Sequence, residues 1–265
     1  MTNWKEIDTY AKQWIKEAGE NIRASFNTEL LIQTKSNPDD LVTNIDKETE
    51  QYFITQINKT YPTHKIFGEE GLGDEVSSLE GVIWIIDPID GTMNFIHQQR
   101  NFAISIAVFE EGVGKIGLIY DVVHDELYHA YKGEGAYIND QRIPPLHKTI
   151  LNEAILGINA TWVTENSRVD HNVLSPIVKA VRGTRSYGSA ALELAYVVTG
   201  RMDAYLTMRL SPWDFAAGVV LIEEVGGTIT TLEGNELNLL TENSIFAAGP
   251  DLHKEIITKF LSSGK

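Results

Sequence analysis

The sequence predicts a mixed α and β fold in two halves, an N-terminal α+β half with a mainly antiparallel sheet and a C-terminal α/β half. Two observations support this prediction: helical stretches precede a series of β-rich segments in the first half, and short strands alternate with helical stretches after Pro144-Pro145. The length of 265 residues allows one large domain or two small ones. We place the boundary near residues 144–152, which divides the chain into residues 1–148 and 149–265.

The first half begins with two helices. Apolar residues recur at helical spacing from Trp4 to Ile22, so the first helix should extend to about Phe26, and Asn-Pro-Asp-Asp at 37–40 should interrupt the helical pattern. A second helix should begin near Thr43 and must end before Pro62. β-rich segments follow at 65–67, 82–86, 102–109 and 115–120, with a hairpin loop at 110–114 and a further meander at 126–143 that turns at 139–140.

The second half alternates between the two kinds of element. Strands are expected at 155–158, 204–208, 227–231 and 244–248, and helices at 173–181, 189–198, 212–225 and 252–261. This alternation predicts a second sheet with its own helices.

The composition excludes several kinds of protein. The chain has 22 Lys and Arg against 37 Asp and Glu, a net charge of −15, so we expect no binding to nucleic acid or to an anionic membrane surface. The absence of cysteine excludes disulfides and thiolate chemistry, and we expect a cytoplasmic protein because no secretory or membrane-spanning pattern is visible. If the ligand is an anion, a bound cation has to attract it.

The strongest chemical signal follows the apolar strand at 82–86. That strand ends in Asp87-Pro88-Ile89-Asp90-Gly91-Thr92. Pro88 fixes one φ and Gly91 allows an unusual one, so both carboxylates can turn to the same side while the amides of Gly91 and Thr92 face open space. This arrangement suits metal ions and phosphate together, although Asp-Pro and Asp-Gly pairs also cap ordinary turns.

Three further segments each allow a structural and a functional interpretation. The acids of Gly68-Glu69-Glu70-Gly71 can form a solvated turn, Asp214 can cap the apolar helix that follows it, and Thr43 with Asp46 has the spacing of a capping box. With Asp87 and Asp90, Glu69 and Asp214 offer hard oxygen ligands and no His or Cys, which suits Mg²⁺ or Mn²⁺ rather than Zn²⁺.

Together these segments resemble the inositol monophosphatase family of magnesium-dependent, lithium-sensitive phosphomonoesterases. The family signatures DxVTxxD, GEE, WxxDPxDGTxNF and PWDxAAG correspond here, in order, to residues 40–46, 68–70, 84–95 and 212–218. The similarity continues through 188–191, 200–203 and 224–227 and covers essentially the whole chain. The resemblance implies a layered αβαβα sandwich and a homodimer.

The resemblance also implies roles for individual residues. Glu69, Asp87 and the carbonyl of Ile89 would hold one ion. Asp87, Asp90 and Asp214 would hold a second, more labile one that Li⁺ can replace. Thr92 and Glu69 would orient the attacking water, and Asp46 would accept a hydrogen bond from Thr92. The amides of Gly91 and Thr92 would meet the phosphate, and the backbone of Gly188, Ser189 and Ala190 would lie near the substrate.

The chain departs from the pattern at Thr207, where relatives active on inositol phosphates usually have a glutamate that binds a ring hydroxyl. Arg185 and Arg209 can instead meet a second anionic group. We therefore expect a Mg²⁺-dependent phosphatase of small phosphate monoesters of the inositol 1-phosphate kind. The alternatives are a phosphatase of nucleotides or sugar bisphosphates, such as NADP(H), 3′-phosphoadenosine 5′-phosphate or fructose 1,6-bisphosphate, and a regulatory binding protein on a phosphatase scaffold.

Overall fold

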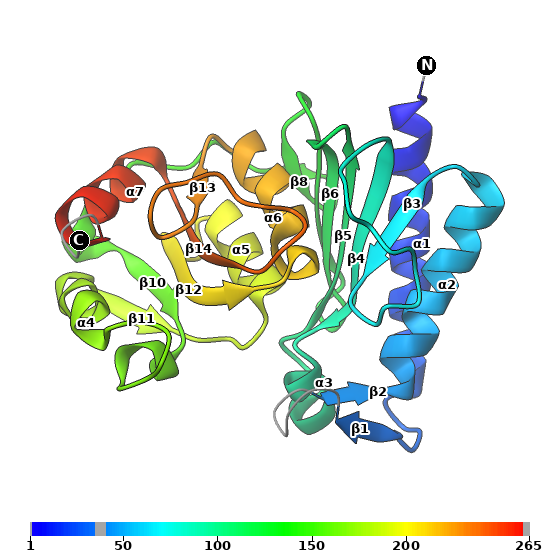
Figure 1. The fold of residues 1–265 in the computed structure, drawn as a ribbon, viewed down its shortest axis with the longest axis horizontal. Coiled ribbons are helices and arrows are strands. Elements are labelled where there is room, and N and C mark those ends of the chain that lie inside the picture. The colour runs from blue at the N-terminus through cyan, green and yellow to red at the C-terminus, as the bar shows by residue number, and fades with distance from the viewer. Residues whose placement is uncertain (1, 35–40, 262–265) are drawn as a thin grey trace.

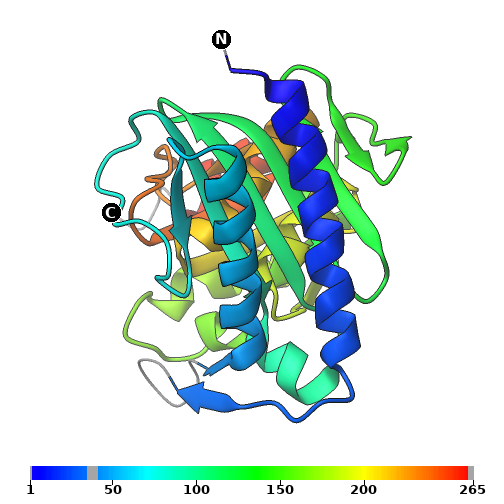
Figure 2. The same ribbon diagram turned by 90° about the vertical axis from the view of Figure 1, so that its right-hand side faces the viewer.

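The computed structural model describes residues 2–34 and 41–261, and these form five layers in the order αβαβα (Figure 1). This arrangement confirms the layered sandwich expected from the family resemblance. Helices α1 (Trp4–Ser25) and α2 (Asn44–Thr60) cover the outer face of a seven-stranded sheet, as Figure 2 shows. Helices α5 (Ala190–Val198) and α6 (Pro212–Glu224) lie between this sheet and a five-stranded one, whose outer face packs against α4 (His171–Ala180) and α7 (Pro250–Ile256).

The seven-stranded sheet belongs to the first half and is mainly antiparallel, as predicted. Its strands follow the order β3-β4-β5-β6-β7-β8-β9, in which β3 and β4 run parallel and each further neighbouring pair runs antiparallel. Their bounds are Lys65–Gly68, Val82–Asp90, Ala103–Glu110, Val113–Asp121, Glu126–Tyr131, Ala136–Ile138 and Gln141–Arg142.

The five-stranded sheet belongs to the second half and has the order β11-β10-β12-β14-β13. The first three strands run parallel, and β14 runs antiparallel to both of its neighbours. The bounds of β10 to β14 are Ile155–Ile158, Gly183–Arg185, Ala204–Leu210, Thr228–Thr230 and Asn243–Ala248. The α/β alternation predicted for this half is therefore present, with β11 as an additional edge strand.

The largest apolar core lies in the middle of the sandwich. It joins Ile83 and Ile85 of β4 to Leu194 of α5 and to Phe215 and Leu221 of α6. Because these helices pack against both sheets, the two predicted halves share one core; the division at residue 148 stays a prediction.

Among the described residues, no helix combines the length and apolar character that a membrane crossing requires.

Several local elements differ from the sequence predictions. The strand expected to end at Ile86 continues to Asp90, and the loop expected at 110–114 is shortened to Glu111 and Gly112, because β5 and β6 pair up to Glu110 and Val113. Several short elements were not predicted. They are the antiparallel strands β1 (Ile32–Thr34) and β2 (Leu41–Thr43), the helix α3 (Thr92–Gln98) and the 3₁₀ helices η1 (Leu151–Glu153) and η2 (Ala160–Val163). A π-helix, η3 (Ile257–Leu261), forms the last part of the predicted helix 252–261, and the break at 37–40 lies outside the described residues.

An ion pair joins the two halves at one edge of the middle layer. The guanidinium of Arg201, between α5 and β12, donates to both carboxylate oxygens of Glu126 on β7, at 2.6 and 2.8 Å. It also donates to the Tyr128 hydroxyl at 2.6 Å. These hydrogen bonds lower the pKa of Glu126 to about 2.

This pair should make stability sensitive to acid. A carboxyl whose pKa is depressed on folding stabilises the protein above its unfolded-state pKa, and this contribution is lost as pH falls from about 4.5 to about 2. We expect Glu126→Gln to lower the free energy of unfolding at pH 7 by about 1 kcal/mol, a modest value because water screens a partly exposed pair. The difference in free energy of unfolding between variant and wild type should shrink across that pH window in urea titrations. A constant difference from pH 7 to pH 2.5 would contradict the assignment.

Candidate active site

The alternation of side chains along β4 determines where Asp87 points. Ile83 and Ile85 face the middle layer, and Trp84 and Ile86 face the outer helices. Successive side chains of a strand alternate between faces, so Asp87 lies on the side of the middle helices. It is 1% exposed, and its Oδ1 accepts the amide of Ile89 at 2.9 Å.

An irregularity in β4 brings Asp90 to the same side. Strict alternation would direct Asp90 toward the outer helices, but the pairing of β4 with β5 shifts register between Asp87 and Asp90. Ile89 packs in the outer core instead. Gly91 then turns the chain into α3 with φ +96°, a conformation that side chains disfavour, and so fulfils the role predicted for a flexible glycine.

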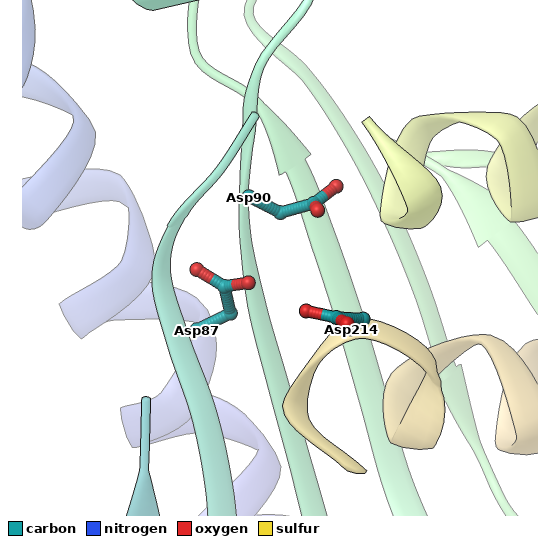
Figure 3. A group of neighbouring side chains, drawn as sticks. All are labelled: Asp87, Asp90 and Asp214. Atoms are coloured by element: carbon teal, nitrogen blue, oxygen red, sulfur yellow. The ribbon is translucent and has the colours of Figure 1, made fainter. Parts of the chain in front are cut away.

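Helix α6 supplies the third carboxylate. The sequence allowed Asp214 to be a helix cap, but the N-cap is Ser211, and Asp214 is the third helical residue whose Oδ2 accepts the Ser211 amide at 2.8 Å. A capping-box acid can serve two purposes, because only one of its oxygens is needed by the backbone. Figure 3 shows the carboxylates of Asp87, Asp90 and Asp214 directed toward one shared space, and one oxygen from each lies within 4.8 Å of the others.

These carboxylates line a cavity of about 200 Å³. All of the residues predicted to hold the metal ions and to meet the phosphate line it, and Leu41 and Met93, which were not predicted, are also part of the lining. The full lining is Leu41, Glu69, Asp87, Ile89, Asp90, Gly91, Thr92, Met93, Gly188 and Asp214.

The carboxylates of the cavity disfavour ionisation of one another. Burial, followed by the charges of Glu69, Asp90 and Asp214, raises the pKa of Asp87 well above its ordinary value. Burial also raises the pKa of Asp214. The pKa of Asp90 is raised by burial to about 6, although the hydrogen bond from Ser189 acts to lower it. A cluster that resists ionisation in the bare protein is suited to a cation, which favours the charged forms.

The cavity lining also contains the hydroxyl of Thr92, which has two acceptors within hydrogen-bond distance. Thr92 Oγ1 lies 3.1 Å from Asp46 Oδ1 and 3.1 Å from the carbonyl of Ile89, and its single hydrogen can be donated to either. Asp46 is fully buried, and its other oxygen accepts the amide of Thr43 at 2.8 Å and the Thr43 hydroxyl at 2.5 Å. The predicted Thr43–Asp46 capping box is therefore present, and the same carboxylate also fixes Thr92.

A turn before α5 holds Asp90 in place. The Ser189 hydroxyl donates to Asp90 Oδ2, and the Ala191 amide donates to the same oxygen at 2.8 Å. A Cβ added at Gly91 would lie 3.2 Å from the Gly188 carbonyl oxygen, so this turn packs closely on β4. Gly188 reaches the cavity, whereas Ser189 and Ala190 are buried behind Asp90.

Sequence reasoning missed two side chains that support this turn. Glu193 is 3% exposed, and its Oε1 accepts the amides of Tyr187 at 2.7 Å and Gly188 at 3.2 Å. Asn94 of α3 donates to the Tyr187 carbonyl at 2.6 Å. Asn94 lies within the WxxDPxDGTxNF signature at residues 84–95. Glu193 is the single acidic residue of an apolar helix, and this isolated charge is the sequence feature that could have indicated its role.

The three residues predicted to determine substrate specificity, Thr207, Arg185 and Arg209, lie outside the cavity lining. Thr207 is 6% exposed, and its hydroxyl accepts the indole N–H of Trp162 at 3.1 Å. Arg185 is exposed at the end of β11, and exposed Arg209 lies 3.9 Å from Glu242. A role for these three residues in specificity stays a prediction.

Comparison with known proteins agrees with this geometry. The sequence profile described as "Inositol monophosphatase family" matches residues 3–265. The chain is 65% identical to the inositol-1-monophosphatase of Bacillus subtilis (strain 168), over 100% of both chains. It also resembles the structure of SaIMPase-II with inositol monophosphate bound, at 41% identity and a TM-score of 0.88, covering 97% of this chain and 94% of that one.

Two further solved structures concern metals. An IMPase/NADP phosphatase complexed with Mg²⁺ and phosphate matches at 27% identity and a TM-score of 0.89, over 100% of this chain and 97% of that one. A LiCl-soaked inhibitory complex of staphylococcal inositol monophosphatase-1 matches at 28% identity and a TM-score of 0.90, over 97% and 95% of the two chains. The fold, the convergent carboxylates and these matches together show that the chain belongs to the inositol monophosphatase family.

Proposed function

We propose that this protein is a Mg²⁺-dependent phosphomonoesterase that hydrolyses inositol 1-phosphate and similar small phosphate monoesters. The observation that carries the proposal is the convergence of Asp87, Asp90 and Asp214 in a cavity that Glu69, Thr92 and Gly91 complete. Membership of the family and the 65% identity to a bacterial inositol-1-monophosphatase support the same substrate class.

The donor set fits magnesium. The cavity offers carboxylate oxygens from Glu69, Asp87, Asp90 and Asp214, and no His or Cys is among the residues that line it. Mg²⁺ prefers oxygen ligands, and Mn²⁺ accepts the same set. We assign Glu69, Asp87 and the Ile89 carbonyl to one ion, and Asp87, Asp90 and Asp214 to a second. When bound, two such ions supply positive charge for the phosphate and lower the pKa of a water molecule.

The protein's own groups orient the reactants. The Thr92 hydroxyl donates its hydrogen to Asp46 or Ile89, so its lone pairs stay available to accept a hydrogen bond from a water molecule in the cavity. Glu69, which also lines the cavity, offers a second acceptor. The amides of Gly91 and Thr92, at the start of α3, are placed to donate to phosphate oxygens, since the first N–H groups of a helix have no partner within it.

The substrate class can be tested with a panel of monoesters. Release of inorganic phosphate would be measured at fixed Mg²⁺ from myo-inositol 1-phosphate, 2′-AMP, NADP, 3′-phosphoadenosine 5′-phosphate and fructose 1,6-bisphosphate. We expect inositol 1-phosphate to be hydrolysed with kcat/KM at or near the top of the panel. A strong preference for a nucleotide or bisphosphate would favour the second class, and no turnover of any ester would favour a binding protein.

Lithium should inhibit the reaction. The second ion is held by Asp87, Asp90 and Asp214, and we expect it to exchange more readily than the ion that Glu69 also binds. Inhibition should appear in rate measurements as Li⁺ is raised at constant Mg²⁺ and ionic strength, with Na⁺ as the control cation. Rates that are equal in Li⁺ and Na⁺ at concentrations well above that of Mg²⁺ would contradict this assignment of ligands.

Position 207 should affect specificity. With threonine there, the protein recognises mainly phosphate and metals, so kcat/KM for unrelated monoesters should differ by about 10–100-fold at most. Thr207→Glu should raise the preference for inositol 1-phosphate over bisphosphates by a similar factor, about 10–100-fold, because a carboxylate binds ring hydroxyls and repels a second phosphate. Thr207→Val is the control, since it also removes the hydrogen bond from Trp162. If Thr207→Glu leaves the preference for inositol 1-phosphate over bisphosphates unchanged, the side chain at this position does not contact the leaving group.

Two finer properties stay predictions. The family resemblance implies a homodimer, and the sequence suggests a cytoplasmic location. Sedimentation of the purified protein would test the first, and fractionation of cells would test the second.

A further inference from the structure

Among the described residues, three glutamates share an unusual contact. Each uses its carboxylate to accept two backbone amides of a tight turn, which for Glu50 and Glu224 is distant in the sequence and for Glu193 directly precedes its own helix. Glu50 of α2 accepts the amides of Glu70 and Leu72, Glu193 of α5 those of Tyr187 and Gly188, and Glu224 of α6 those of Gly133 and Gly135. The turn held by Glu224 joins β7 to β8 and contributes nothing to the cavity lining.

The contact made by Glu50 uses both carboxylate oxygens. Oε2 accepts the Glu70 amide at 2.8 Å, and Oε1 accepts the Leu72 amide at 2.9 Å. Glu50 is 0% exposed. A Cβ added at Gly68 would lie 2.5 Å from the Glu50 carboxyl carbon, so the turn rests directly on this side chain. Charge-assisted hydrogen bonds in a buried place are strong, and losing either acceptor would leave an amide unpaired.

The turn that rests on Glu50 contains Glu69. The Glu69 amide donates to the carbonyl of Ile86 at 3.2 Å, which ties this side of the turn to β4 beside Asp87. The next amide along the chain, that of Glu70, donates to Glu50, which holds the turn on the side of helix α2. The backbone that carries the Glu69 side chain is therefore held at two successive amides, and Glu50 accepts one of them.

Helix α2 thus supports two residues of the cavity lining without lining the cavity itself. Asp46 fixes Thr92, and Glu50, one helical turn later, fixes the turn that carries Glu69. Residues four apart lie on the same face of a helix, so one rigid element sets the relative position of Thr92 and Glu69. These are the two side chains assigned above to orienting water.

We propose that Glu50 is a positioning residue for the ion that Glu69 binds, a role that rests on the proposed function. Glu50 touches neither the cavity nor the reacting groups, and it acts through the turn from Gly68 to Leu72. Groups that orient a metal ligand in this way typically change metal affinity or activity by about 10–100-fold when they are replaced.

The test compares Glu50→Gln with Glu224→Gln in full-length, metal-stripped protein. A glutamine at position 50 keeps one acceptor and turns an NH₂ group toward the other amide. The same exchange at position 224 affects an equivalent pair of hydrogen bonds at 2.8 Å each, remote from the cavity. The readouts are the Mg²⁺ concentration that gives half of the maximal thermal stabilisation, the same titration with Mn²⁺ followed by electron paramagnetic resonance, and the Mg²⁺ dependence of phosphate release.

We expect Glu50→Gln to raise the half-saturating Mg²⁺ and Mn²⁺ concentrations by about 10–100-fold, with kcat largely recovered at saturating Mg²⁺. Glu224→Gln should lower thermal stability without moving either midpoint. Gly68→Ala serves as a second variant if Glu50→Gln does not fold, because it retains the carboxylate and displaces it sterically, and it should shift the midpoints in the same direction.

Midpoints in Glu50→Gln and Gly68→Ala that equal those of Glu224→Gln would overturn the proposal and leave Glu50 a structural residue. The metal titrations do not depend on turnover, so the failure of the proposed function would be recognised separately. A wild-type protein that binds Mg²⁺ but hydrolyses no monoester would contradict the proposed function, while the comparison of midpoints would still decide the role of Glu50.

Discussion

Asp87→Asn should abolish phosphate release while leaving the fold intact. Asp87 is assigned to both ions, and an asparagine in its place would offer either ion a neutral oxygen and no negative charge. We expect kcat/KM for inositol 1-phosphate to fall by about 10²–10³-fold or more, since the groups that stabilise the transition-state charge are lost together.

The same change should stabilise the metal-free protein. The pKa of Asp87 is raised by burial and by its acidic neighbours, so its ionised form opposes folding at neutral pH. This penalty is absent below the unfolded-state pKa of the carboxyl and grows as pH rises toward the folded-state value. Thermal unfolding in EDTA should therefore show a higher midpoint for Asp87→Asn than for wild type at pH 7, with a smaller difference near pH 4.

Asp203→Asn is a suitable control, because Asp203 also binds a hydroxyl and an amide, from Thr149 and Ile155, outside the cavity. It should keep full Mg²⁺-dependent activity. Turnover near the wild-type rate by Asp87→Asn in saturating Mg²⁺ would exclude the assignment of this residue to both ions.

Thr92→Val should lower kcat strongly with little change in metal binding. Valine has nearly the same shape as threonine but cannot accept a hydrogen bond from water, so the contribution of an oriented acceptor, about 10²–10⁴-fold, should be lost. The Mg²⁺ dependence should stay close to that of wild type, because Thr92 is not a proposed ligand. Single-turnover phosphate release and Mg²⁺ titration would measure the two effects.

Thr199→Val provides the matched control for this change. The Thr199 hydroxyl also donates to a backbone carbonyl, that of Ala195, and lies outside the cavity. It should retain the wild-type kcat. A Thr92→Val variant whose kcat also stays within about twofold of wild type would show that the hydroxyl does not take part in the rate-limiting step.

Much of the site could be predicted from local sequence patterns. The apolar strand that ends in Asp87, the glycine at position 91 and the acidic turn at Glu69 each carry their own signal, and the family signatures indicated that they converge. The side of the sheet on which the Asp90 side chain lies could not be derived from the alternation of strand residues, because it depends on a register shift between β4 and β5. The capping box of Asp214 likewise did not reveal that the same carboxylate faces the cavity.

The supporting groups were harder to predict because their partners are backbone amides. Glu50 acts on Glu70 and Leu72, about twenty positions away, and no spacing rule links a helix residue to a turn at that distance. The burial of Thr207 under Trp162 is similar, since it joins β12 to the η2 segment 45 residues earlier. Such contacts follow from the packing of layers rather than from periodicity.

The most direct test of the account is the restoration of metal to purified, metal-stripped protein in the presence of myo-inositol 1-phosphate. The account predicts no phosphate release in EDTA and a rate that rises with added Mg²⁺ to saturation in wild type, but not in Asp87→Asn. Hydrolysis that proceeds at the full rate without a divalent cation, or no hydrolysis at any Mg²⁺ concentration, would contradict it.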